Sequence, residues 1–231
     1  MSSPPVDPRN RSRIRRVAIP CLAVLLLIGL SVTAYKSRYF VFPKRFGVVV
    51  PGQIYRSGQL SRFLVESTLC KHQIRHIIDL TGFTDSDPDQ RAEREAARRL
   101  KIAHHRFNLK GDGTGEIENY AAALEIVIKA QQAGEPVLIH CAAGSQRTGG
   151  TVAAYRLLFQ GWSTDRVLSE LESYDWNPRK DQTLLSYLDD HWTELTASLV
   201  RRGILAEIPE KLPTLSNGPP QEAPIVTSLS D

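Results

Sequence analysis

From Phe46 onward, short apolar runs alternate along the chain with longer mixed stretches typical of helices. The apolar runs that predict buried strands are residues 46–50, 74–80, 103–109 and 136–141. The stretches that predict helices are residues 60–72, 88–100, 117–132, 147–159, 163–173 and 181–200. Because strands alternate with helices, we predict an α/β fold with a central, mostly parallel sheet flanked by helices.

Turn and cap residues set the borders of several of these elements. The Pro-Gly pair at 51–52 separates FGVVV from QIYRS and therefore predicts a β-hairpin. Asp87 or Asp89 can cap the helix of residues 88–100, whose arginines come late, as the helix dipole favours. Gly134 follows the next predicted helix and marks its end.

A separate apolar run of 18 uncharged residues, 17–34, lies near the N-terminus and follows five arginines. At about 1.5 Å per residue, a helix of this length crosses a thin hydrocarbon core. Arginines before such a run are typical of an N-terminus that stays in the cytoplasm. We therefore predict one transmembrane anchor over residues 17–35. A signal peptide cleaved after Ala34 and a buried core helix are the alternatives.

Charge separates this N-terminal region from the rest of the chain. The net charge is +4, of which residues 1–44 carry +7, so the remainder carries −3. A slightly acidic body argues against a nucleic-acid binder, which needs a basic face on its folded part. The three cysteines, at positions 21, 70 and 141, are too few for a disulfide scaffold or a four-ligand zinc site. Cys70 falls in a helical pattern and is predicted to lie in the core.

These patterns divide the chain into five segments. They are a basic tail of residues 1–16, the anchor of residues 17–35, a linker of residues 36–45, a folded domain of residues 46–200 and a disordered tail of residues 208–231. Five prolines occur beyond Ile208 together with Ser, Gly and Gln, a composition that does not favour a packed core. We expect the folded domain to carry the chemistry.

The most informative stretch is VLIHCAAGSQRTGG, residues 137–150. A predicted buried strand is followed by Cys141, five further residues, Arg147 and a helix. The backbone N–H groups of residues 142–147 can curl into a concave nest at the helix N-terminus, which is a site for a phosphate group. Gly144 permits the turn at positive φ that such a loop requires.

Three side chains add chemistry to this loop. Arg147 supplies a planar fork that holds two phosphate oxygens at once. Cys141 lies in the same positive field, which lowers the pKa of its thiol and favours a nucleophilic thiolate at neutral pH. Thr148 follows, with a hydroxyl that can donate to the sulfur and help it leave. The stretch therefore predicts a phosphate site with a reactive thiol.

The string HCAAGSQRTG, residues 140–149, resembles the signature HCxxGxxRTG of the cysteine-based protein tyrosine and dual-specificity phosphatases. With PGQIYRSGQL, IRHIIDLT and YRLLFQGWS, the chain is similar to the compact atypical dual-specificity group of bacteria, fungi and plants. The resemblance covers residues 46–195. It implies a protein-tyrosine-phosphatase-like fold for residues 46–200 and a reaction that needs no metal or other cofactor.

The resemblance also implies a role for each residue of the loop. Cys141 would be the nucleophile, and Arg147 the phosphate clamp. His140 would orient the loop and support a low pKa of the thiol, with Thr148 in a supporting role. The residues whose backbone amides would bind the phosphate oxygens are Ala142, Ala143, Gly144, Ser145, Gln146 and Arg147.

A general acid is also expected, because the leaving oxygen must be protonated. Asp112 lies 29 residues before Cys141, in a loop, KGDG, whose glycines let it close over a substrate. We predict that Asp112 protonates the leaving group and then activates water. Glu116 and Glu118 are the alternatives.

Two further patterns are predicted to be structural. The resemblance gives the segment YRSGQ, residues 55–59, a mainly architectural role, with Arg56 able to face the site. His104 and His105 lack a third ligand at useful spacing, so no metal site is predicted there. Asp79 ends a predicted strand and is expected to brace a loop.

The substrate and its location follow from charge. No basic residue occurs in residues 142–146, which favours a modestly charged substrate such as a phosphotyrosine or phosphoserine/threonine protein. A phosphoinositide or inositol-phosphate phosphatase is the alternative, and a non-catalytic, membrane-anchored phosphate-binding module is a third. An anchor with its N-terminus in the cytoplasm places the catalytic domain outside it. Four basic residues after the run leave the reverse orientation open: Lys36, Arg38, Lys44 and Arg45.

Overall fold

The computed structural model describes residue 24, residues 26–33 and residues 37–216. It divides into two units, residues 1–42 and residues 43–231. In the first unit, residues 26–33 are helical and a 3₁₀ turn, η1, spans Arg38–Phe40. Among the described residues no helix has both the length and the apolar character needed to cross a membrane. Much of the predicted anchor of residues 17–35 lies outside the described residues.

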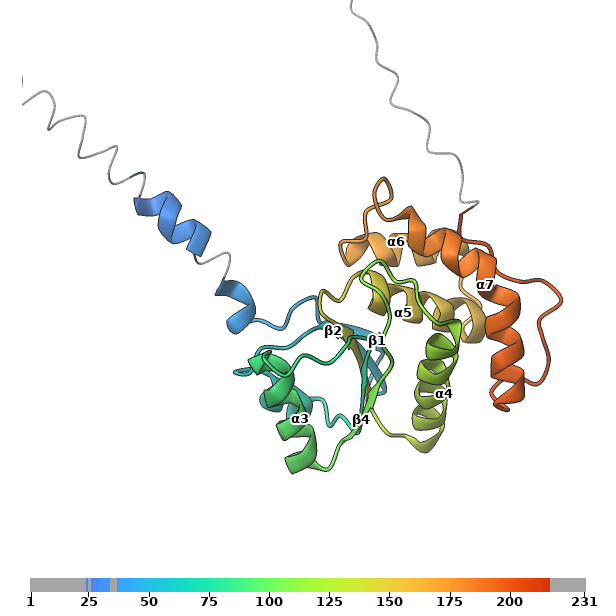
Figure 1. Ribbon diagram of the computed structural model, residues 1–231, viewed down its shortest axis with the longest axis horizontal. Helices are drawn as coiled ribbons and strands as arrows, with labels where there is room; N and C mark the ends of the chain where they lie inside the picture. The colour runs from blue at the N-terminus through green and yellow to red at the C-terminus, as the bar shows by residue number, and fades with distance from the viewer. Residues whose placement is uncertain (1–23, 25, 34–36, 217–231) are drawn as a thin grey trace, which may run out of the picture. The chain divides into compact units, whose positions relative to one another are not determined.

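The second unit is built around one five-stranded sheet (Figure 1). Its strand order is β1-β2-β5-β3-β4. Only β1 and β2 pair antiparallel, as the predicted hairpin, while the other neighbours are parallel. The mostly parallel sheet predicted from the sequence is therefore confirmed. The strands are β1 (Gly47–Val50), β2 (Ile54–Gly58), β3 (His76–Asp79), β4 (Ala103–Arg106) and β5 (Val137–Cys141).

Helices cover both faces of this sheet, and each face has its own apolar core. The smaller core packs under α2 (Val65–Lys71) and α3 (Pro88–Leu100). The larger core includes residues of the four other helices, with α4 on the opposite side of the sheet from α3 (Figure 1). Those helices are α4 (Ile117–Ala133), α5 (Gln146–Phe159), α6 (Thr164–Ser173) and α7 (Gln182–Arg201).

The central strand β5 separates the site into two halves. Successive side chains of a strand point to opposite faces of its sheet. Ile139 and Cys141 accordingly belong to the larger core, whereas Leu138 belongs to the smaller core under α3. His140 has the parity of Leu138, so it faces α3, while Cys141 faces the opposite side. This alternation is what places the signature histidine and cysteine on different faces.

Local signals explain most helix borders. Asp87 caps α3, because its carboxylate accepts from the backbone N–H groups of Asp89 and Gln90. This resolves the choice between the two predicted caps. Gly134 ends α4 in the left-handed conformation at φ 69°, which glycine adopts without a Cβ clash.

Two predictions differ from the structure, one on the C-terminal tail and one on the burial of Cys70. The sequence predicts a disordered tail from residue 208, yet Leu215 is buried and its backbone N–H donates to Asp189 of α7. Leu215 therefore packs the proline-containing stretch against the folded domain, up to residue 216, the last residue that the structure describes. The predicted core position of Cys70 is wrong, because Cys70 lies on the exposed side of the short helix α2.

Candidate active site

The loop after β5 closes around the sulfur of Cys141. Cys141 is 1% exposed, and the backbone N–H of Gly144 donates to its Sγ at 3.1 Å. Gly144 has φ 80°, and a Cβ there would lie 2.7 Å from the carbonyl carbon of Ser57. Only glycine fits this position, because a side chain would meet both a strained backbone and the neighbouring strand.

Three cations hold the carbonyl groups of this loop. The donors to the carbonyl oxygens of residues 142, 143 and 144 are Lys44 Nζ at 3.1 Å, Arg45 Nη1 at 2.7 Å and Arg56 Nη2 at 3.0 Å. In a planar trans peptide the carbonyl and the following N–H point in opposite directions. Holding the carbonyls outward therefore turns the next N–H groups toward Cys141, as the contact from Gly144 shows.

Arg56 is a fully buried member of this set. Its guanidinium lies 3.7 Å from the centre of the Tyr174 ring, and burial lowers the pKa of Arg56 to about 10. Arg45 is fixed from the other side by Asp175, 2.7 Å away. Lys44 and Arg45 were predicted to belong to a linker and to flank the membrane anchor, so their contact with the loop was missed.

The surroundings of Cys141 favour its thiolate. Burial raises the pKa of the thiol, but the hydroxyl and backbone N–H of Thr148, the N–H of Gly144 and the Arg147 guanidinium lower it. The net result is a pKa of Cys141 below that of an ordinary thiol. Hydrogen bonds to the charged form stabilise it in this way.

Arg147 is held at the edge of the same loop by backbone groups. Its Nη1 donates to the carbonyl oxygens of Leu80, at 3.4 Å, and Leu109, at 3.5 Å, which follow β3 and β4. Its Nε is buried without a hydrogen-bond partner among the described residues. A buried donor of this kind is costly unless an acceptor arrives, so the arrangement suits an anion.

Asp112 lies in the loop of residues 110–115, and its carboxylate is held by Thr114. Oδ1 accepts from the backbone N–H of Thr114 at 3.0 Å and from its hydroxyl at 2.8 Å. The backbone hydrogen bond from Thr114 is the main cause that lowers the pKa of Asp112. In this conformation Asp112 braces its own loop, which is the opposite of what a proton donor requires.

The same loop nevertheless borders the thiol site through Tyr120. This buried side chain of α4 donates to the carbonyl oxygen of Gly113 at 2.6 Å. Burial raises the pKa of Tyr120, and the charges of Cys141 and Asp112 add to the effect, which places both groups within electrostatic reach of one ring. Of the alternative acids, Glu118 is engaged by Arg201, the last residue of α7, and by Arg202, which follows it.

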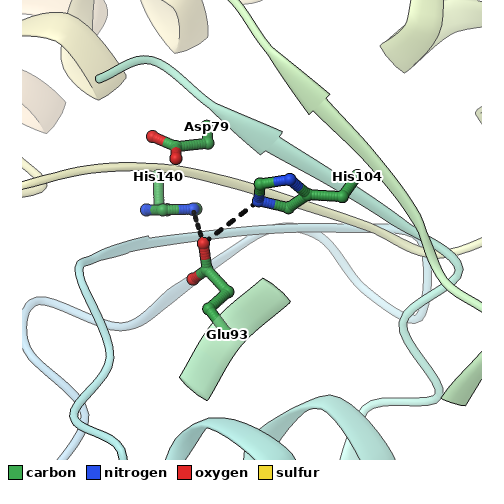
Figure 2. A group of neighbouring side chains, drawn as sticks. All are labelled: Asp79, Glu93, His104 and His140. Atoms are coloured by element: carbon green, nitrogen blue, oxygen red, sulfur yellow. Dashed lines mark hydrogen bonds and ion pairs between the residues drawn. The ribbon is translucent and has the colours of Figure 1, made fainter. Parts of the chain in front are cut away.

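Four polar side chains form a cluster on the α3 face of the sheet (Figure 2). They are Asp79, Glu93, His104 and the signature histidine, His140. Glu93 Oε1 is 3.2 Å from Nε2 of His140 and 3.2 Å from Nε2 of His104. Burial lowers the pKa of His140, but the charge of Glu93 and then of Asp79 outweigh it and raise the pKa to about 9. This shift favours the protonated form of His140 at neutral pH.

A family comparison agrees with this geometry. The profile of the tyrosine phosphatase family matches residues 40–199. The chain belongs to the tyrosine phosphatase family. Among curated proteins, the dual specificity protein phosphatase TpbA of Pseudomonas aeruginosa is 43% identical over 49 residues. That match covers 20% of this chain and spans 22% of the length of TpbA.

Solved structures show the same fold. The catalytic core of the PP-IP phosphatase SIW14 from S. cerevisiae has a TM-score of 0.55 at 24% identity, over 71% of this chain and 95% of that one. TpbA of P. aeruginosa has a TM-score of 0.53 at 18% identity, over 69% and 91%. PTPMT1 has a TM-score of 0.53 at 17% identity, over 68% and 99%.

In this family member, the predicted site residues are only partly brought together. The structure gathers the loop of residues 142–147 and Thr148 around Cys141, but it leaves Asp112 bonded to Thr114. Sequence reasoning missed the partners of His140. One signal for Glu93 was available: it shares the buried side of α3 with Ala96 and Ala97, where a charged residue needs a partner.

Proposed function

We propose that this chain hydrolyses phosphomonoesters through a cysteinyl-phosphate intermediate. The observation that carries the proposal is the convergence on Cys141 of inward amides, the unpartnered Arg147 Nε and a thiol of lowered pKa. A phosphate group bound there would accept from the amides and the guanidinium, which stabilise the charge that develops on its oxygens.

The reaction takes two steps. The Cys141 thiolate attacks phosphorus, the ester P–O bond breaks, and the leaving oxygen takes a proton from Asp112. Asp112 then removes a proton from water, whose oxygen attacks phosphorus and breaks the S–P bond. Phosphate leaves, and the thiolate is regenerated. Asp112 must first exchange its bonds to Thr114 for contact with the leaving group, so the loop of residues 110–115 rearranges during turnover.

The substrate we favour is a phosphotyrosine or phosphoserine/threonine side chain. Ser145 and Gln146 add no charge to the loop, and several cations around it already hold protein groups. Lys44, Arg45 and Arg56 bond loop carbonyls, and Arg106 pairs with Asp79 at 2.6 Å. Cations that hold protein groups are less available to a second or third phosphate of a polyanion.

A phosphoinositide or inositol phosphate is the second candidate. The neighbours support it, because SIW14 is described as a PP-IP phosphatase and PTPMT1 has been solved in complex with PI(5)P. The third candidate, a phosphate-binding module without turnover, is disfavoured because both Cys141 and Arg147 are present.

Turnover separates these candidates. The full chain, purified in detergent, is assayed with para-nitrophenyl phosphate, a panel of phosphopeptides and a panel of inositol phosphates. We expect hydrolysis of para-nitrophenyl phosphate with and without EDTA, since thiolate chemistry needs no metal, and faster turnover of phosphopeptides. Phosphate binding without turnover would favour the module, and preference for inositol phosphates would favour the second candidate.

We also propose that residues 17–35 anchor the chain in a membrane as a single span. The 18 uncharged residues and the five arginines before them support this assignment. The N-terminus is then cytoplasmic and the catalytic domain lies outside the cytoplasm. A signal peptide cleaved after Ala34 remains the competing proposal.

A further inference from the structure

The cluster of Asp79, Glu93, His104 and His140 (Figure 2) lies on the α3 face of the sheet. Cys141 belongs to the core on the opposite face. His140 and Cys141 are consecutive residues of β5, so the backbone of one strand separates them. The cluster does not touch the loop of residues 142–147 through any of its four side chains in the contacts described above. His140, which precedes Cys141 in β5, is the direct link between the cluster and the thiol. Gln59 is a second link, because its amide donates to Glu93 and its backbone N–H donates to the carbonyl oxygen of Ala142.

Glu93 is the centre of the cluster. Its side chain is fully buried, and its Oε1 is shared by the imidazoles of His104 and His140. Its other oxygen accepts from the Gln59 amide at 3.1 Å. Burial raises the pKa of Glu93, but the charge of His140 and then the contacts with His104 and His140 together outweigh it and lower the pKa to about 2. A buried carboxylate that stays ionised requires a cation beside it.

The remaining charges of the cluster are already balanced. Asp79 Oδ2 pairs with Arg106 at 2.6 Å, and its Oδ1 accepts from the backbone N–H and hydroxyl of Thr81. His140, whose Nε2 lies 3.2 Å from Glu93 Oε1, can balance the negative charge of Glu93. One protonated imidazole makes the group neutral, so the charges do not call for a divalent ion, although four possible ligand atoms lie within 4.8 Å of one another.

We propose that Glu93, held by His104 and Gln59, is a positioning residue that keeps His140 protonated and thereby stabilises the thiolate of Cys141. This inference rests on the proposed function, because it concerns the same nucleophile. The titratable groups around His140 are Asp79 of β3, Glu93 of α3 and His104 of β4. Cys141 is the next residue of its own strand and faces the opposite side. Ser57, its register partner in β2, is neutral.

Alkylation of Cys141 by iodoacetamide measures its thiolate without requiring turnover. The full chain is alkylated between pH 5 and pH 9, and the tryptic peptide of residues 130–147, in which Cys141 is the only cysteine, is quantified by mass spectrometry. In Glu93→Gln we expect alkylation about tenfold slower at pH 6, which corresponds to a rise of about one unit in the thiol pKa.

Two variants separate this effect from a general disturbance. Glu95→Gln changes an exposed carboxylate of the same helix, which pairs with Arg99, and is expected to keep the wild-type pH profile. Glu93→Asp retains the charge and is expected to restore most of the wild-type rate at pH 6. A loss of packing alone would affect the shorter Glu93→Asp more than the nearly isosteric Glu93→Gln, and that result would overturn the proposal.

A second measurement needs no variant and covers the case in which Glu93→Gln does not fold. In the wild-type chain labelled at histidine, NMR should show His140 protonated at pH 7.5. A neutral His140, an unchanged alkylation profile in folded Glu93→Gln, or a stoichiometric metal ion lost in that variant would each overturn the inference. An ordinary thiol pKa in the wild type would instead contradict the proposed function.

Discussion

Arg45 donates from Nη1 to the carbonyl oxygen of Ala143 at 2.7 Å, across 98 residues of sequence. Asp175 fixes the same guanidinium through Nε, from the turn after α6. A segment next to the predicted anchor and a segment near the last helix thus meet at the phosphate loop. The orientation of the loop amides depends on residues well outside the signature.

The first prediction concerns this contact. Arg45→Ala should weaken binding of the phosphate analogue vanadate roughly tenfold, because a hydrogen bond from a charged donor contributes about 1.5–3 kcal/mol and Arg45 is partly exposed. Vanadate inhibition of para-nitrophenyl phosphate turnover gives the affinity. Arg62→Ala, which removes an ion pair to Asp89 on α3, is the matched control. Equal affinities in the wild type and Arg45→Ala would show that the loop keeps its shape unaided.

The second prediction concerns the nucleophile and its clamp. Cys141→Ser should abolish turnover but retain phosphate-analogue binding, because the loop amides and Arg147 remain. Arg147→Lys should also be severe, since an ammonium group cannot reproduce a two-point fork. Turnover and isothermal titration of the same preparations separate the two effects. A Cys141→Ser rate above a few per cent of the wild type would remove Cys141 from its role.

The third prediction concerns the general acid. Asp112→Asn should lower kcat by roughly 10²–10⁴, the usual contribution of general acid catalysis. The loss should be smaller for para-nitrophenyl phosphate than for a phosphopeptide, because a good leaving group needs less protonation. Thr114→Val, which removes one hydrogen bond to Asp112, should raise its pKa and shift the alkaline limb of the pH profile upward.

An Asp112→Asn variant with wild-type rates on phosphopeptides would transfer the role to another acid. Glu116 is the better remaining candidate, because Glu118 pairs with Arg201 and Arg202. Measuring Glu116→Gln on the same two substrates then tests that assignment directly.

The sequence predicted the fold well because its signals are local. The Pro-Gly turn, the cap at Asp87 and the left-handed Gly134 each depend on a few neighbouring residues. The alternation of short apolar runs with helices then restricts the topology to a mostly parallel sheet. The loop around Cys141 could be predicted equally well, because its functional residues lie in one continuous stretch, residues 140–149.

The partners of that loop could not be predicted, because they depend on contacts between distant segments. Lys44 and Arg45 carry charge next to an apolar run, which equally fits a membrane flank. Glu93 and His104 come from a helix and a strand whose register only the folded sheet defines. The hydrogen bonds from Thr114 to Asp112 are local, but an Asp-Gly loop also fits a mobile acid.

The fourth prediction links the buried cluster to stability. The folded-state pKa of His140, about 9, exceeds the ordinary value of 6.5, so its contribution is complete below pH 6.5 and is lost as the pH rises through 9. The pKa of Glu93, about 2, is depressed, so its contribution is present above pH 4.5 and is lost as the pH falls through 2.

The free energy of unfolding should therefore fall between pH 6.5 and pH 9.5 in the wild type and much less in Glu93→Gln. Urea unfolding at a series of pH values gives both curves, with Glu95→Gln as the control on the same helix. Parallel curves for the wild type and Glu93→Gln over this range would contradict a protonated His140.

The last prediction concerns location. The five arginines before residue 17 should hold the N-terminus in the cytoplasm, so the phosphatase domain should be digested by protease added to intact bacterial spheroplasts that express the chain. A cytoplasmic marker protein, which must survive, reports that the membranes are sealed. Replacing Arg15 and Arg16 by glutamate should reduce the digested fraction, because four basic residues follow the run and favour the reverse orientation. A domain protected from protease in the wild type would contradict the outward assignment. A mature chain in the soluble fraction that begins at Tyr35 would replace the anchor by a cleaved signal peptide.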